Sequence, residues 1–242
     1  VGSALVASFT ASKVLWLREN EPENAAKVAA ICLPHDYLSW KLSGSKDIKV
    51  LITDRSDASG TGYFAGNSNT YVSEIIDYLE LPKNVIFPKV LGPKDSTLKT
   101  PNGTLIAPGA GDNAAAAFGV GASLGDVVVS LGTSGTAFSV SKTSTSDPSG
   151  EVAGFSDVTG NFLPLVCTLN ATRIMDSANN ILGSNFQELS ELALQAEPGA
   201  GGLTLLPYFE GERTPNRPDA TGVLSGMTLA NTTRPNIARA MI

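Results

Sequence analysis

Two short turns in the middle of the chain carry residue types that phosphoryl transfer requires. The first, GAGD at residues 109–112, ends in Asp112. The second, about twenty residues further on, consists of Gly132, Thr133, Ser134 and Gly135. A carboxylate can orient a hydroxyl group and accept its proton, and a glycine-rich turn can present backbone N–H groups to phosphate oxygens. The two turns together indicate transfer of a phosphoryl group to an alcohol.

Each turn also has a purely structural interpretation. Aspartate is a preferred N-cap residue, so Asp112 could simply cap the helix that follows it. The 132–135 turn could be an ordinary hairpin turn, because it lacks the lysine and the spacing of the G-x-x-x-x-G-K-[ST] phosphate loop. Capping and catalysis are compatible roles for Asp112.

Other polar residues leave similar alternatives open. His35, the only histidine, precedes Asp36 and could relay a proton, although a histidine at a helix start is more often structural. Asp54 and Asp57 could bind a polyol or cap local turns. The Glu212-Arg213 pair could form a local ion pair or close a loop on a ligand.

The elements around the two turns indicate an α/β protein, because apolar strand-like runs alternate with helical patterns. Residues 104–107 predict a buried strand that leads into the first turn, and residues 113–121 predict a helix of small side chains. Three consecutive valines after Asp126 predict a strand buried on both faces, followed by a hairpin. Further helices are expected over residues 10–20 (capped by Thr10), 22–31, 70–79 and 170–182, with another between Asp36 and Gly44, and a strand over residues 163–166.

The composition excludes several classes of partner. The net charge is −6 and no long basic run occurs, so we expect no nucleic acid. No apolar run reaches about 18 residues, so we expect no membrane span. Cys32 and Cys167 lack metal-ligand spacing, which fits the reducing cytoplasm.

The two ends of the chain suggest a fragment. Val1 is not methionine, and Ile242 falls within a helical pattern. The composition changes near Ser123, which predicts two domains, residues 1–122 and 123–242. The isolated chain could therefore expose an apolar interface and pair as a homodimer.

Two long patterns resemble the signatures of the FGGY carbohydrate kinases. Residues 8–20, SFTASKVLWLREN, match the first signature. The second is matched by GVLSGM at 222–227, NI at 236–237 and AMI at 240–242, and its last acidic position falls beyond Ile242. The segments LPHDYL, SDASGT, GAGDNAAAAFGVG, SLGTSG and LPYFEGERTP are most similar to those of the xylulokinase branch.

The resemblance implies a partial ribonuclease-H-like, actin-like fold of two domains. Residues 1–122 would be the C-terminal part of the sugar-binding N-terminal domain, and residues 123–242 the first part of the nucleotide-binding C-terminal domain. It implies ATP and Mg²⁺ as cofactors and D-xylulose as substrate. Asp112 would be the catalytic base, Asp112 and Asn113 would bind the sugar, and the 132–135 turn would bind phosphate. No residue is assigned to the metal.

Alternatives to this function remain. The substrate could be ribulose, gluconate or glycerol, or the chain could be a non-catalytic actin-like nucleotide-binding module. The family's Asp-x-Gly-Thr phosphate loop and Gly-rich adenosine motif do not occur in these residues. We therefore expect the 242 residues alone to be inactive.

Overall fold

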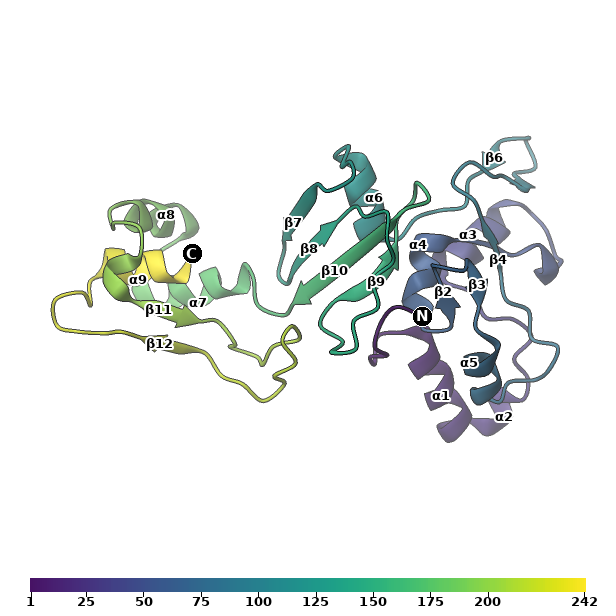
Figure 1. The fold of residues 1–242 in the computed structure, drawn as a ribbon, viewed down its shortest axis with the longest axis horizontal. Coiled ribbons are helices and arrows are strands. Elements are labelled where there is room, and N and C mark those ends of the chain that lie inside the picture. Colours follow the sequence, from purple (N-terminus) through teal and green to yellow (C-terminus); the bar gives the residue numbers. More distant parts are fainter. The chain divides into compact units, whose positions relative to one another are not determined.

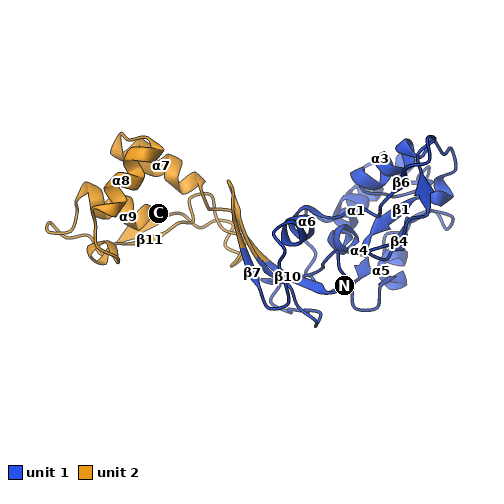
Figure 2. Cartoon of the chain, turned by 90° about the horizontal axis from the view of Figure 1, so that it is seen from above, with its two compact units in different colours: residues 1–128, 138–165 blue, residues 129–137, 166–242 orange.

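The computed structural model describes all residues, Val1–Ile242, and the chain falls into two compact units (Figure 2). Unit 1 comprises residues 1–128 and 138–165, and unit 2 comprises residues 129–137 and 166–242. Helices and short strands alternate in both units, which confirms the mixed α/β class (Figure 1). The boundary expected between residues 122 and 123 remains a prediction. None of the helices is long and apolar enough to cross a membrane.

The helices of unit 1 follow the predicted pattern with several corrections. They are α1 (Thr10–Asn20), α2 (Pro22–Ala25), α3 (Pro34–Leu42), α4 (Arg55–Ala58), α5 (Ser73–Tyr78) and α6 (Asp112–Gly119), with the 3-10 turns η1 (Ile48–Val50) and η2 (Ser59–Thr61). The N-cap of α1 is Phe9, so Thr10 does not cap it. The helix predicted over 22–31 ends at Ala25, since Ala30 instead pairs with Ile86 in a β-bridge. The helix predicted over 70–79 starts at Ser73, because residues 70 and 71 join a strand.

Three small two-stranded sheets build the rest of this region of unit 1. They pair β1 (Ile52–Asp54) with β4 (Lys89–Leu91) in parallel, and β2 (Phe64–Ala65) with β3 (Thr70–Tyr71) and β5 (Leu98–Lys99) with β6 (Leu105–Ile106) antiparallel. Every residue of β1 is buried. Ile52 packs with Leu91, Leu98 and Ile106 in one apolar cluster. This packing fixes the end of β1, where Asp54 begins the candidate site.

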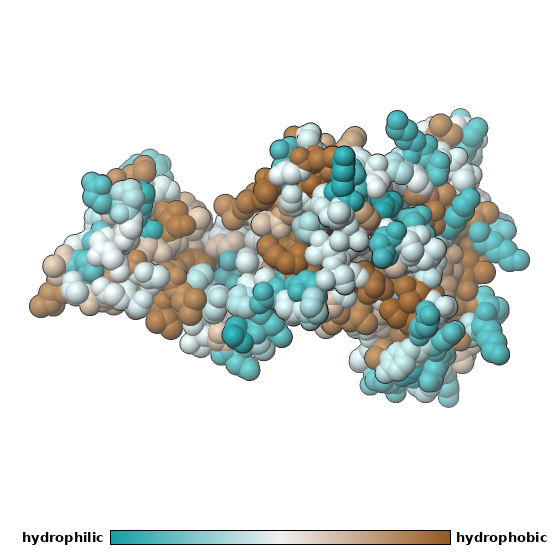
Figure 3. Space-filling model, in the orientation of Figure 1, coloured by the Kyte–Doolittle hydropathy of each residue, from teal (hydrophilic) through white to brown (hydrophobic).

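A four-stranded sheet has the order β7 (Val127–Leu131), β8 (Gly135–Ser139), β10 (Phe162–Thr168) and β9 (Ala153–Ser156). The 132–135 turn connects β7 to β8, as the sequence predicted. The predicted burial of the valine strand is wrong, because Val127 is 67% and Val129 63% exposed. The cause is that no other element of the chain covers the side chains of β7 on either face of the sheet. Other apolar side chains also reach the surface (Figure 3).

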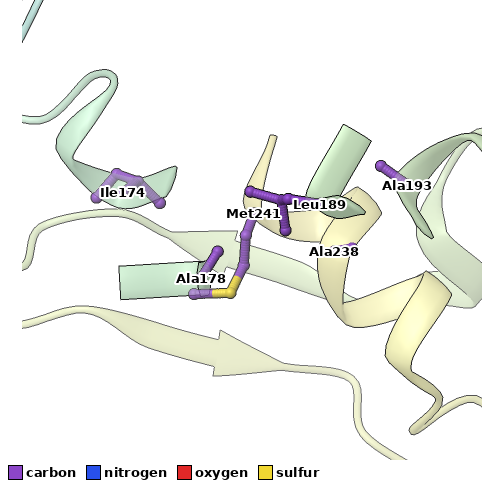
Figure 4. Close-up of a cluster of buried hydrophobic side chains, with 6 residues drawn as sticks. All are labelled: Ile174, Ala178, Leu189, Ala193, Ala238 and Met241. Carbon is purple, nitrogen blue, oxygen red and sulfur yellow. The ribbon is translucent and has the colours of Figure 1, made fainter. Parts of the chain in front are cut away.

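Unit 2 is built around three helices, α7 (Arg173–Leu182), α8 (Phe186–Leu194) and α9 (Arg234–Met241), with the turn η3 (Ala200–Gly202) and the antiparallel pair β11 (Thr204–Leu206) and β12 (Val223–Ser225). Ala178 and Ala238 are fully buried between the helices, where their small side chains permit close approach (Figure 4). At the start of α8, Asn185 and Glu188 satisfy each other's backbone N–H groups in a capping box. The helix predicted over residues 170–182 corresponds to α7, which begins at Arg173.

Candidate active site

Asp112 is the first residue of α6, and its side chain is exposed. The N-cap of α6 is Gly111, so the capping interpretation of Asp112 is wrong. One carboxylate oxygen, Oδ1, accepts hydrogen bonds from the backbone N–H of Asn113 at 2.7 Å and from its side-chain amide at 3.0 Å. The N-terminus of a helix favours negative charge. Asp112 is thus an oriented, ionisable group that solvent and ligands can reach.

The backbone before Asp112 packs tightly against more distant residues of unit 1. Gly109 has a φ of +101°, and a Cβ atom placed on it would lie 2.5 Å from Cδ2 of His35. The N–H of Gly111 donates to Oγ of Ser56 at 2.9 Å. Glycine at position 109 is therefore required both by its left-handed conformation and by the imidazole beside it.

Asp54 caps α4, which confirms the structural alternative for this residue. Its carboxylate accepts hydrogen bonds from the N–H of Ser56 at 2.6 Å and from that of Asp57 at 3.2 Å, and also from the hydroxyl of Ser56. Asp36 does not start α3 but stands in its first turn, where Oδ2 accepts from the N–H of Leu33 at 2.7 Å. Both carboxylates are buried.

His35 lies among three carboxylates. Its Nδ1 is 2.7 Å from Oδ2 of Asp57, and its Nε2 is 3.0 Å from Oδ1 of Asp36 and 3.5 Å from Oδ1 of Asp54. The hydrogen bond to Asp57, together with the other negative charges, outweighs burial and raises the pKa of His35 to about 9. Burial raises the pKa of Asp36 to about 6, although the hydrogen bond from Leu33 and the charge of His35 oppose it. His35 therefore carries a positive charge at neutral pH.

Ligand atoms of His35, Asp54 and Asp57 lie within 4.8 Å of one another, which makes them the obvious group to test as a metal site. The arrangement does not fit Mg²⁺, which prefers oxygen ligands in octahedral geometry. A metal also needs a neutral ring nitrogen, whereas both nitrogens of His35 face carboxylates. The group is better described as an imidazolium surrounded by carboxylates.

The 132–135 turn lies in unit 2 and has its own supporting contacts. The carbonyl of Gly132 accepts from the N–H of Thr172 at 3.0 Å and from its hydroxyl at 2.8 Å. A Cβ atom on Gly135 would lie 2.9 Å from Oγ1 of Thr168. Gly132 donates its own N–H to Ser134 at 3.1 Å, so that donor is used within the turn. Thr133 and Ser134 remain exposed at its tip.

Glu212 organises the segment that supports this turn. It is 3% exposed and accepts hydrogen bonds from the N–H of Leu169 at 2.6 Å, the N–H of Arg213 at 2.7 Å and the amide of Asn170 at 3.2 Å. Burial alone would raise the pKa of Glu212, but these hydrogen bonds lower it. The guanidinium of Arg213 does not pair with Glu212 and instead donates to Sγ of Cys167 at 3.1 Å. The ion-pair interpretation of Glu212-Arg213 is therefore wrong.

Sequence reasoning missed the residues that support the two turns. Ser56, Thr168, Asn170 and Thr172 act through hydrogen bonds to segments far away in the sequence. Thr168, Asn170 and Thr172 belong to none of the motifs that the sequence offered, and the SDASGT segment that begins at Ser56 did not indicate its contact with Gly111. Asp112 lies in unit 1 and the 132–135 turn lies in unit 2.

The mixed α/β fold, with a carboxylate at the start of a helix and a glycine-rich hairpin turn after it, agrees with the fold of solved sugar kinases. The chain belongs to the FGGY family of carbohydrate kinases. The model of the family's N-terminal domain matches residues 1–119, and the model of its C-terminal domain matches residues 127–242.

Named relatives agree with this assignment. The xylulose kinase of Streptomyces coelicolor is 44% identical over 93% of this chain and 46% of its own length. The crystal structure of xylulose kinase from Bifidobacterium adolescentis has a TM-score of 0.91 and 49% identity, and the match covers 100% of this chain and 53% of that one. The glycerol kinase of Plasmodium falciparum shares the fold, with a TM-score of 0.82. It is 20% identical, and the match covers 99% of this chain and 50% of that one. The chain thus spans about half the length of these relatives.

Proposed function

We propose that the intact protein transfers the γ-phosphoryl group of ATP to D-xylulose, forming D-xylulose 5-phosphate and ADP, with Asp112 as general base. The observation that carries the proposal is the carboxylate of Asp112, which is exposed, oriented by Asn113 and attached to a turn that packs against His35 and is hydrogen-bonded to Ser56. The similarity to xylulose kinases supports D-xylulose as the substrate.

In the proposed reaction, Asp112 accepts the proton of the terminal hydroxyl group as that oxygen attacks the γ-phosphorus. The new O–P bond forms while the bond to the bridging oxygen of ADP breaks. Asn113 would hold the carboxylate of Asp112 in place and contribute to sugar binding. The 132–135 turn would donate hydrogen bonds to phosphate oxygens, where negative charge develops.

Mg²⁺, which we propose as the metal that accompanies ATP, neutralises phosphate charge when it is bound. We assign no residue of this chain to it, because the carboxylates around His35 already bind an imidazolium. We also propose that the 242 residues alone do not catalyse phosphoryl transfer, since they span about half the length of the related kinases.

A coupled ADP-release assay on the intact protein tests the substrate. We expect the highest kcat/KM with D-xylulose, and lower values with ribulose, gluconate and glycerol. A higher kcat/KM for one of those three would identify it as the substrate in place of D-xylulose, and the protein would still be a sugar kinase. ATP binding without turnover of any of the four would instead support a nucleotide-binding module. Turnover by the 242-residue chain at the rate of the intact protein would contradict the proposal that the chain alone is inactive.

A further inference from the structure

Three segments that are far apart in the sequence meet at the His35 side chain. The ring is part of α3, Asp54 and Asp57 come from the end of β1 and the start of α4, and Gly109 belongs to the turn before Asp112. The ring is 26% exposed, so it is largely enclosed by these neighbours. A change in the charge or position of this ring is therefore expected to affect the backbone that leads to Asp112.

Hydrogen bonds connect the ring and the turn through α4. The N–H of Gly111 donates to Oγ of Ser56 at 2.9 Å, and the hydroxyl of Ser56 donates to Oδ2 of Asp54. The other oxygen of Asp54 lies 3.5 Å from Nε2 of His35. The turn is thus held on one side by contact between Gly109 and the ring, and on the other by the hydrogen bond to Ser56.

The charges around the ring require it to be positive. Three carboxylates face it: Asp36 from α3, Asp54 from the end of β1, and Asp57 from α4, while the turn brings only the backbone of Gly109. Asp36 is 1% exposed; the N–H of Leu33 and the hydroxyl of Thr53 stabilise its carboxylate, and the cation that faces it is His35, whose Nε2 lies 3.0 Å from Oδ1. A neutral ring would leave this buried negative charge uncompensated, which is strongly unfavourable.

We propose that His35 is a positioning residue for phosphoryl transfer: as an imidazolium it binds the carboxylates of α3 and α4 together and so fixes the 109–111 turn that presents Asp112. The proposal rests on the proposed function, because Asp112 matters only if it is the base. It does not make His35 a catalytic residue, since the ring contacts the turn and not Asp112 itself.

The positioning role has a defined pH dependence. Because the pKa of His35 is raised to about 9 in the folded protein, the ring keeps its charge through neutral pH and loses it as the pH rises through 9. We expect the turn to loosen over the same range. A histidine that served only as packing material would keep the turn closed on both sides of its titration.

The ring can be observed directly, because His35 is the only histidine of the chain. In a ¹⁵N-histidine-labelled sample, we expect one imidazole that titrates near pH 9, with both nitrogens protonated at pH 7. The exposed Asp77 of α5 provides a matched control: Asp57→Asn should lower the midpoint by about one unit or more, and Asp77→Asn should leave it unchanged. A wild-type midpoint at or below 6.5, the value of free histidine, would overturn the proposal without any variant.

The turn and the activity give the second readout. We expect His35→Gln to speed hydrogen exchange at the Gly111 amide about tenfold or more, and wild-type exchange to rise above pH 9 beyond its chemical rate. In the intact protein, His35→Gln should lower kcat more than it raises the KM for ATP. Unchanged Gly111 exchange in a folded His35→Gln protein would contradict the positioning role. If His35 titrates near pH 9 and the exchange of the Gly111 amide depends on His35, but Asp112→Asn keeps full activity, Asp112 is not the general base. The positioning of the 109–111 turn by His35 would still hold.

Discussion

Substitution of Gly109 measures how tightly the turn before Asp112 is held. Alanine at a φ of +101° is strained, which costs about 1–2 kcal/mol. Its Cβ would also lie 2.5 Å from Cδ2 of His35, and overpacking of this kind costs about 1–3 kcal/mol. We therefore expect Gly109→Ala to lower the free energy of unfolding by about 2–5 kcal/mol, the sum of the two costs. Urea denaturation followed by tryptophan fluorescence measures the loss.

Gly103 provides the matched control. It has a φ of +88°, and a Cβ placed on it would meet nothing within 4 Å, so Gly103→Ala reports the backbone cost alone. The contact with His35 is isolated by a double-mutant cycle with His35→Ala, for which we expect a coupling of about 1–2 kcal/mol. Equal losses for Gly109→Ala and Gly103→Ala, or a coupling near zero, would refute the close contact between the turn and the ring.

Three further predictions concern stability and assembly. The raised pKa of His35 contributes stability that is complete below pH 6.5 and is lost as the pH rises through about 9. The difference in unfolding free energy between wild type and His35→Gln should therefore shrink by about 2 kcal/mol between pH 6 and pH 10, after allowance for the partly exposed ring. A difference that stays constant with pH in urea denaturation would contradict this. Glu212→Gln should destabilise the protein by about 1–3 kcal/mol, because the neutral amide accepts weaker hydrogen bonds from Leu169 and Arg213, and equal melting temperatures would contradict it. The exposed edge strand β7 should make the isolated chain self-associate. Val129→Lys should then shift the mass measured by light scattering towards that of the monomer. A wild-type chain that is monomeric at all concentrations would contradict this prediction.

Local patterns predicted the local structure well. Residues 10–20 form α1 with the predicted bounds, because the good helix formers Leu15, Leu17, Arg18 and Glu19 dominate its second half and Pro22 follows. The Gly-rich turn at 132–135 lies between two strands, as its composition indicated. The start of α6 at Asp112 was also within one residue of the prediction.

Long-range contacts account for the failures. Residues 26–31 have a helical composition, but pairing of Ala30 with Ile86 overrides it. Exposure of β7 depends on whether distant elements cover the faces of the sheet, which valine content does not reveal. The role of His35 depends on Asp54, Asp57 and Gly109, which no pattern of neighbouring residues connects to it.

The most direct test of catalysis by Asp112 is the turnover of Asp112→Asn in the intact protein with D-xylulose and ATP. Asparagine keeps the size of the side chain and the start of α6 but cannot accept the proton, so we expect kcat to fall by about 10²–10⁴-fold. ATP binding, the melting temperature and the titration of His35 should stay unchanged. A variant that is folded and keeps kcat within about tenfold of wild type would show that Asp112 is not the general base.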